Sequence, residues 1–89
     1  MIAKIKRDVF IRYEKDLPGE NVFIFIGSKN NMLTANLEVY EIIKLIKECN
    51  DKNEILGRLC EKYEANSKEE ILEGLNYTLE YLMDKEVIE

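Results

Sequence analysis

Two segments in the first third of the chain have patterns that are typical of β-strands: residues 6–14 alternate with a period of two, and residues 21–26 form a short apolar run. Residues 6–14 place Val9, Ile11 and Tyr13 on one face of a strand. Residues 21–26, with the sequence NVFIFI, are apolar on both faces, which indicates a central strand that is covered on at least part of each face. The pattern therefore predicts two strands in this part of the chain.

Turn residues separate these two strands and lead to a third. Pro18 and Gly19 favour a reversal, because proline presets φ at the second position of a turn and glycine accepts a positive φ at the third. A second group of turn residues, at 27–31, precedes a short strand expected at residues 32–35. The sequence thus predicts a three-stranded antiparallel sheet with its third strand at an edge.

A polar residue follows the third strand directly and starts the first of three predicted helices, residues 37–49. Asn36 is a favoured N-cap, because its side-chain oxygen can accept a hydrogen bond from a free backbone N–H of the first turn. Glu38 lies where a carboxylate meets the positive end of the helix dipole. Apolar residues recur at helical spacing: Leu37, Tyr40, Ile43, Leu45 and Ile46. We expect this junction to hold strand and helix rigidly together.

Two capping patterns predict the next helices. Asp51 with Glu54, and Ser67 with Glu70, have the spacing at which side chain and backbone cap each other at a helix start. The second helix is expected to bury Ile55, Leu59 and Tyr63. The third helix, residues 68–84, has an apolar arc made of Ile71, Leu72, Leu75, Leu79, Leu82 and Met83.

Two glycines and two residues near the C-terminus give further packing predictions. Gly57 and Gly74 lie inside the second and third predicted helices, where glycine costs roughly 1 kcal/mol relative to alanine. We expect both glycines to allow a close contact between helices. At Gly74 the alternative is that the missing side chain opens a groove. Val87 and Ile88 are expected to pack back onto the sheet or the first helix.

Length and composition fit one small domain covering residues 1–89. The predicted elements give this domain an α+β fold in which a three-stranded antiparallel sheet is followed by a three-helix bundle. No window approaches the ~18 apolar residues of a membrane span, so we expect no membrane association. Residues 1–7 lack the apolar core and cleavage site of a secretory signal, which predicts a cytoplasmic location. Cys49 and Cys60 lack a CxxC spacing and are expected to be reduced structural thiols.

Charge is distributed unevenly along the chain. Residues 1–66 contain eleven basic and eleven acidic side chains, whereas residues 67–89 contain two lysines and seven acids. The net charge of −5 therefore comes from the region of the third helix. A winged-helix DNA-binding domain would need positive charge on that helix, so nucleic-acid binding is a weak alternative.

An enzyme is also disfavoured by the residue types present. The chain has no histidine, no glycine-rich phosphate loop, no paired-cysteine spacing and no nucleophile motif. We therefore expect no catalytic residue, no metal site and no cofactor. A generic adaptor that binds only another protein is a more serious alternative.

Several short motifs resemble those of the PqqD-like family, the leader-peptide recognition elements (RREs) of ribosomally synthesised and post-translationally modified peptide (RiPP) biosynthesis. That family tends to show a Leu-Asn pair at the strand-to-helix junction, an Ile-Leu pair six and seven residues after the Asn, an Ile in the next helix and a Leu-x-x-x-Tyr at its end. The corresponding residues in this sequence are Ala35-Asn36, Ile42-Ile43, Ile55, Leu59 and Tyr63. The resemblance spans about residues 22–88.

The resemblance implies a small winged-helix-like domain that acts as a non-catalytic peptide chaperone. It would bind the leader of a precursor peptide as an added strand on its third strand, with the leader's other side against the third helix. The implied peptide-binding residues on the strand are Asn31, Met32, Leu33, Thr34 and Ala35. On the helix we favour the flank with Leu72, Asn76, Leu79 and Met83 over the flank with Gly74, Thr78 and Tyr81.

The resemblance also implies partners and leaves two points of geometry open. The leader would be presented to a separate modification enzyme, such as a radical S-adenosylmethionine protein, or to a leader peptidase, and the domain would be a monomer or a weak homodimer. An edge strand can template an incoming peptide through its unpaired N–H and C=O groups. The sequence does not decide whether Leu33, or instead Met32 and Thr34, directs its N–H outward, nor which helix flank faces the peptide.

Overall fold

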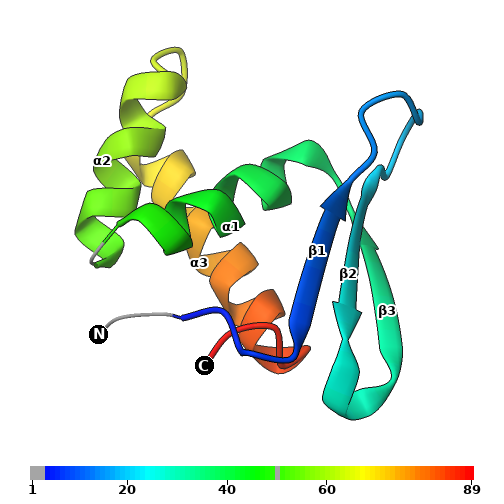
Figure 1. Ribbon diagram of the computed structural model, residues 1–89. Coiled ribbons are helices and arrows are strands. Elements are labelled where there is room, and N and C mark those ends of the chain that lie inside the picture. Colours follow the sequence, from blue (N-terminus) through cyan, green and yellow to red (C-terminus); the bar gives the residue numbers. More distant parts are fainter. Residues whose placement is uncertain (1–3, 50) are drawn as a thin grey trace.

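The computed structural model describes residues 4–49 and 51–89, within which a three-stranded sheet is followed by three α-helices. The predicted domain of residues 1–89 thus includes four positions, 1–3 and 50, outside the described residues. The sheet lies on one side of the molecule and the helices lie on the other (Figure 1). The elements are β1 (Val9–Tyr13), β2 (Val22–Ile26), β3 (Asn31–Ala35), α1 (Leu37–Glu48), α2 (Lys52–Lys62) and α3 (Lys68–Asp84). This is the α+β arrangement that the sequence predicts.

The sheet is antiparallel, has the order β1-β2-β3, and therefore has β2 at its centre. Alternation along β2 directs Val22, Ile24 and Ile26 into the core, where they are almost fully buried. Phe23 and Phe25 point to the opposite face and are only half-buried. The prediction of a central β2 and of an edge position for β3 is confirmed.

Two reversals connect the strands. Gly19 has a positive φ of 73°, which glycine adopts without a side-chain clash. The second reversal is a 3-10 turn at Gly27–Lys29, followed by Asn30 in the left-handed conformation. The chain then pairs again from Asn31, so β3 begins one residue earlier than predicted. β1 is shorter than predicted because residues 7 and 8 form a turn, in which the N–H of Val9 donates to the carbonyl of Lys6.

All three helices start at the cap residues that the sequence indicates. The side chain of Asn36 accepts from the N–H of Val39, and the side chain of Asp51 accepts from the N–H of Glu54. Ser67 and Glu70 form a complete capping box at the start of α3. Since only Asn36 separates β3 from α1, the strand and the helix are joined without a loop.

One cluster of buried apolar side chains joins the helices to the inner face of the sheet. Its fully buried members are Val22, Ile24, Ile26, Ile43, Leu75, Leu82, Val87 and Ile88. The prediction that Val87 and Ile88 pack back into the molecule is confirmed. Ile88 also forms a β-bridge with Ile5, which brings the two ends of the described chain side by side (Figure 1).

The glycine prediction is corrected by the structure. A Cβ built on Gly57 or on Gly74 would meet no atom within 4 Å. Neither glycine therefore mediates a close helix contact, because both face open space. The alternative weighed for Gly74, that its missing side chain opens a groove, agrees with this geometry.

Two further findings concern the lengths of the helices and the state of the cysteines. Among the described residues, no helix is long and apolar enough to cross a membrane. Cys49 is buried and Cys60 is half-buried, and neither forms a disulfide. Burial raises the pKa of the Cys49 thiol, so this side chain behaves as part of the core.

Candidate peptide-binding site

The free edge of β3 can be deduced from the hydrogen bonds on the other side of β2. The N–H of Glu14 donates to the carbonyl of Asn21 at 2.8 Å. The N–H of Gly27 donates to the carbonyl of Asp8, also at 2.8 Å. In residues 21–27, which include β2, the odd-numbered residues therefore form their backbone hydrogen bonds with β1. Because the backbone groups of a central strand alternate between its two neighbours, the even-numbered residues form theirs with β3. Their partners on β3 are Ala35 for Val22, Leu33 for Ile24 and Asn31 for Ile26.

This register determines which way the backbone groups of the five predicted β3 residues point. The backbone groups of Asn31, Leu33 and Ala35 point into the sheet, whereas those of Met32 and Thr34 point outward to the free edge. The question that the sequence left open is decided in favour of Met32 and Thr34. The side chains alternate as well: Leu33 is half-buried and Ala35 buried against the core, while the other three are exposed.

A cavity of about 470 Å³ begins at the residue that follows β3 and extends between the three helices. Apolar side chains of the core form its floor, and aromatic, amide and carboxylate side chains form its rim. Its lining residues are Asn36, Glu38, Val39, Ile42, Leu59, Tyr63, Asn66, Glu70, Ile71, Gly74, Leu75, Tyr77 and Thr78. The missing side chain of Gly74 leaves this cavity open.

The cavity is lined by the flank of α3 that the sequence analysis ranked second. Gly74 and Thr78 of that flank line it, whereas Tyr81 does not. Tyr77, which the sequence analysis placed on neither flank and which is 73% exposed, lines it as well. Of the favoured flank, Leu72 and Leu79 pack partly against the core, Asn76 is half-buried and Met83 is exposed. None of these four residues lines the cavity. The structure brings β3 and the cavity together through Asn36, and the favoured flank lies outside this arrangement.

Tyr63 is a fixed wall of the cavity because its hydroxyl is held in place. The hydroxyl donates to Glu41 Oε2 at 2.6 Å, while Lys62 Nζ bonds the other carboxylate oxygen. The hydrogen bond to Glu41, assisted by burial, raises the pKa of Tyr63 to about 12. Burial opposes ionisation of Glu41, but the bonds from Lys62 and Tyr63 outweigh it and lower its pKa. The carboxylate therefore stays ionised and anchors α1 to the end of α2.

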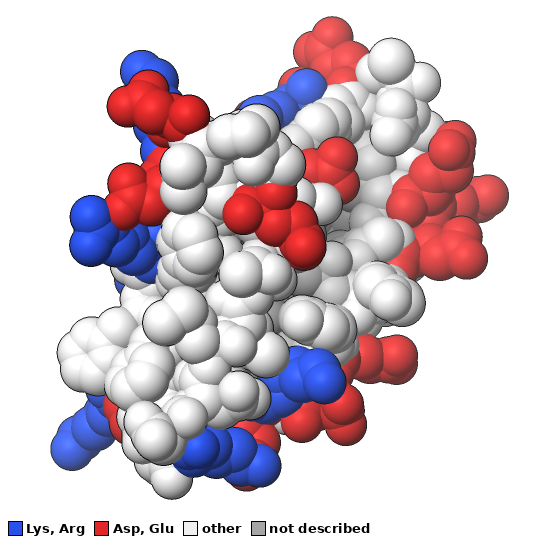
Figure 2. Space-filling view, turned by 90° about the vertical axis from the view of Figure 1, so that its right-hand side faces the viewer, with Lys and Arg blue, Asp and Glu red and all other residues white. Residues whose placement is uncertain are grey.

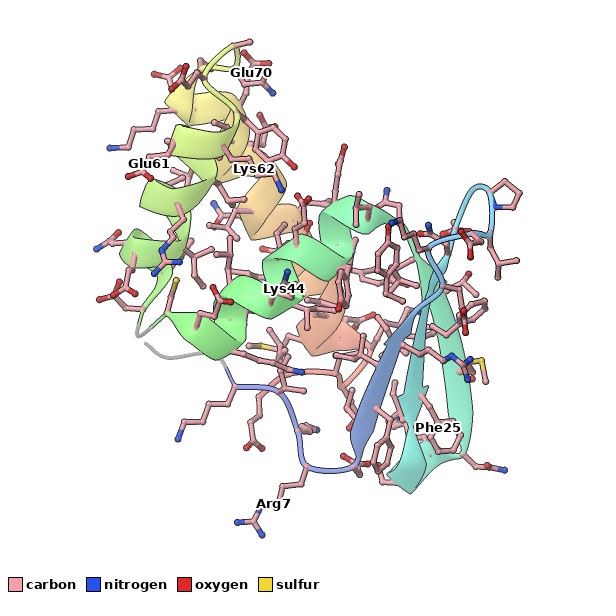
Figure 3. The ribbon with its side chains drawn as sticks, turned by 45° about the horizontal axis from the view of Figure 1, so that its top comes forward. Arg7, Phe25, Lys44, Glu61, Lys62 and Glu70 are labelled. Carbon is pink, nitrogen blue, oxygen red and sulfur yellow. The ribbon has the colours of Figure 1, made fainter. Side chains whose placement is uncertain are left out.

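The outer face of the sheet carries an exposed apolar patch that the sequence analysis did not single out. Phe10 is 64% and Met32 58% exposed, and Phe25 lies between them in the register. The rings of Phe10 and Phe25 are 6.4 Å apart, and Phe25 lies on the sheet, well away from the helices (Figure 3). Figure 2 shows a broad uncharged surface on the sheet side of the molecule, with acidic side chains along one border. The alternation along each strand was the available signal for this patch, because it places Phe10, Phe25 and Met32 on the face opposite the buried side chains.

Within residues 4–49 and 51–89, no group of three or more His, Cys, Asp or Glu side chains is placed to hold a metal ion. Comparisons with family models, with curated proteins and with solved structures find no match to this chain. The PqqD-like resemblance therefore rests on the chain's own residues.

Proposed function

We propose that this protein is a non-catalytic chaperone that binds the leader of a ribosomally made precursor peptide and presents it to a separate modification enzyme. The observation that carries the proposal is the outward-facing edge of β3, which leads without a loop into the cavity at Asn36. An incoming extended peptide gains main-chain hydrogen bonds from such an edge, and an adjacent pocket gives it side-chain selectivity.

The edge of β1 offers a second place for an added strand, and two observations favour β3. The N–H of Val9, at the start of β1, is already bonded to Lys6. At the other end of β1, the ring of Tyr13 stacks on Tyr40 of α1 at 5.0 Å. Only β3 runs directly into a cavity-lining residue, so a peptide added there has side chains within reach of the helices.

The direct test is a titration of the protein with the leader segment of the short reading frame next to its gene. It is carried out in chelator and without nucleotide, and we expect saturable binding at micromolar affinity or better. No saturable binding to that leader would remove the proposed function.

A proline comparison tests the mode of binding. Met32→Pro and Thr34→Pro each delete an outward N–H without touching the ladder to β2, because proline is tolerated on an edge strand whose N–H faces solvent. We expect both variants to stay folded and to lose at least tenfold in leader affinity, while Met32→Ala and Thr34→Ala lose less. Leu33→Pro removes a ladder bond and is expected to destabilise the fold. Equal effects of proline and alanine at 32 and 34 would show that the peptide does not add as a strand.

The apolar patch on the outer sheet face supports a second candidate function, an adaptor that binds another folded protein. Exposed apolar patches on small proteins often mark interaction surfaces. Phe10→Ser and Phe25→Ser would weaken a complex formed through this face and leave leader binding unchanged. No leader binding by the wild type, together with a protein complex that Phe10→Ser and Phe25→Ser weaken, would place the adaptor ahead of the leader chaperone.

A further inference from the structure

We propose that the cavity beyond β3 receives a lysine or arginine side chain of the bound peptide. The inference rests on the proposed function and adds the chemical class of the residue that the site selects. It assigns a role to the side chains around Gly74 that β-strand addition by itself does not use.

The shape of the cavity fits a long side chain with an apolar stem. Its floor is formed by core residues, among them Ile42, Ile71 and Leu75. Tyr63 and Tyr77 are at its rim, and the hydroxyl bond to Glu41 holds Tyr63 in place. Lysine and arginine bury their methylene stems on apolar surface while keeping the charged end in a polar environment. A cation near an aromatic face gains further stabilisation.

The charges at the rim favour a cation. Glu38 and Glu70 line the cavity, and its lining contains no lysine or arginine. Glu38 makes no ion pair with any described residue. Glu70 uses only Oε1 in the capping box with Ser67. Within the described residues its second carboxylate oxygen has no hydrogen-bond partner and is available to a ligand. Two carboxylates therefore remain for a positively charged ligand.

Lys62 does not cancel this charge. Its ammonium lies 5.8 Å from the centre of the Tyr63 ring, but it is bonded to Glu41. Lys62 and Glu41 thus compensate each other. Figure 3 shows Lys62 directed toward α1, whereas Glu61 points outward from α2.

An unsatisfied acceptor near the cavity calls for a donor. Asn21 Oδ1 is buried and has no hydrogen-bond partner among the described residues. Asn21 lines a neighbouring hollow that shares Asn36, Glu38 and Tyr63 with the cavity. Buried acceptors are rarely left without a donor, and ammonium and guanidinium groups supply donors only. Asn21 does not line the cavity itself, so a basic side chain would reach this acceptor only by extending into the neighbouring hollow.

The test starts from phage-displayed random 12-residue peptides selected on the immobilised full chain. The best peptide is synthesised, and each of its lysine or arginine residues is replaced in turn by norleucine, which keeps the stem and removes the charge. Affinities are measured for the wild type and for Gly74→Leu, in which the added side chain fills the cavity. Since a Cβ at position 74 meets nothing within 4 Å and leucine is a good helix former, this variant is expected to fold.

Gly57→Leu is the matched control. Gly57 is also a helix-interior glycine that faces open space, but it does not line the cavity. We expect one norleucine replacement to weaken binding about tenfold in the wild type and in Gly57→Leu, and to have little effect in Gly74→Leu. Glu38→Gln should reduce the same selectivity without filling the cavity, and so replaces Gly74→Leu if that variant is misfolded.

The outcomes separate this inference from the function on which it rests. If no peptide is selected, or if selected peptides bind Met32→Pro as well as the wild type, the proposed strand addition fails and this inference fails with it. If binding is lost in Met32→Pro but no norleucine replacement matters, only the basic side-chain site is overturned. The same holds if norleucine matters equally in the wild type and in Gly74→Leu.

Discussion

At the scale of single residues, Tyr63 links stability to the candidate site. Its hydroxyl bonds Glu41 of α1, and its ring lines the cavity. A hydrogen bond to a charged acceptor is worth more than a neutral one, about 1.5–3 kcal/mol when well protected. The carboxylate of Glu41 is partly exposed, so a contribution of about 1 kcal/mol is reasonable.

The first prediction is a pH-dependent loss of stability in Tyr63→Phe. Because the folded pKa of Glu41 is lowered from 4.5, its contribution is complete above that pH and is lost as pH falls through the folded value. Because the pKa of Tyr63 is raised from 10 to about 12, the tyrosine contribution is complete below pH 10 and is lost as pH rises toward 12. Tyr63→Phe should therefore lower the unfolding free energy by about 1 kcal/mol at neutral pH, with smaller effects at both extremes.

Urea denaturation at several pH values measures this effect, and Tyr77→Phe is the control. Tyr77 is exposed and its hydroxyl makes no hydrogen bond with the described residues. Its removal should change stability by less than about 0.5 kcal/mol at any pH. A pH-independent loss in Tyr63→Phe would mean that packing of the hydroxyl, and not its bond to an ionised carboxylate, stabilises this corner.

At the scale of elements, the end of α3 shows how the helix is joined to the core. Glu86 has a positive φ of 63°, its N–H donates to Met83, and the N–H of Val87 donates to Leu82. This is a Schellman motif, in which the residues after and within the helix end also make an apolar contact. Val87 and Leu82 are both fully buried, so the turn directs the C-terminal segment back into the core.

The second prediction is that Glu86→Gly stabilises the protein at high salt. Glycine adopts positive φ freely, and we expect a gain of about 0.5–1 kcal/mol in unfolding free energy at roughly 1 M NaCl, where surface charges are screened. At low salt the gain should be smaller, because Glu86 forms ion pairs with Lys6 and Lys29, and each exposed pair contributes about 0–1 kcal/mol.

The neighbouring position provides the control for this prediction. Lys85 has a φ of −83°, so Lys85→Gly removes no strain and adds backbone freedom in the unfolded chain. It also removes the ammonium that lies 5.9 Å from the centre of the Tyr81 ring. It should be destabilising at both salt concentrations. Destabilisation of Glu86→Gly at high salt would indicate that the left-handed turn is not strained in this protein.

At the scale of the whole molecule, the distribution of charge suggests which peptides are attracted. The net charge of −5 comes from residues 67–89, and acidic side chains border the uncharged surface of the sheet side (Figure 2). Exposed charges act mainly on the rate of encounter between partners. Basic peptides should therefore associate faster than acidic ones, and the difference should decrease with salt.

The third prediction concerns charge reversal on α3. Glu73→Lys with Glu80→Lys should slow association with a lysine-containing peptide several-fold at low salt and leave its dissociation rate nearly unchanged. The control is the double variant Glu61→Lys with Glu64→Lys, which has the same net charge as the α3 variant. It changes side chains near the end of α2, where Glu61 points outward (Figure 3). Both rate constants are measured at two salt concentrations.

Three outcomes of that experiment are informative. A larger effect from α3 than from the control places the encounter surface on the α3 side. Equal effects would mean that only net charge matters, and an unchanged association rate at low salt would contradict steering. In a separate titration, tight binding of duplex DNA by the wild type would contradict the assignment of this face to a peptide.

The sequence by itself determined the elements and their starts. The alternation of residues 6–14, the apolar run at 21–26 and the turn residues around it placed the strands within three residues at each end. Asn36, Asp51 and Ser67 marked the helix starts, because capping depends on a side chain and the backbone within one turn. The edge position of β3 also followed from the order of strands and turns. These features are local, so neighbouring residues are sufficient to specify them.

Only the tertiary structure decided which atoms of these elements face the candidate site. The backbone N–H groups of Met32 and Thr34 point outward because of the register between β3 and β2. A shift of that register by one residue would direct them inward. The choice of the Gly74 flank over that of Leu79 depends on how α3 is rotated against α1 and α2, and both flanks border the same apolar arc in the sequence. Register and rotation are set by packing between distant segments, and the chain's local pattern does not contain them.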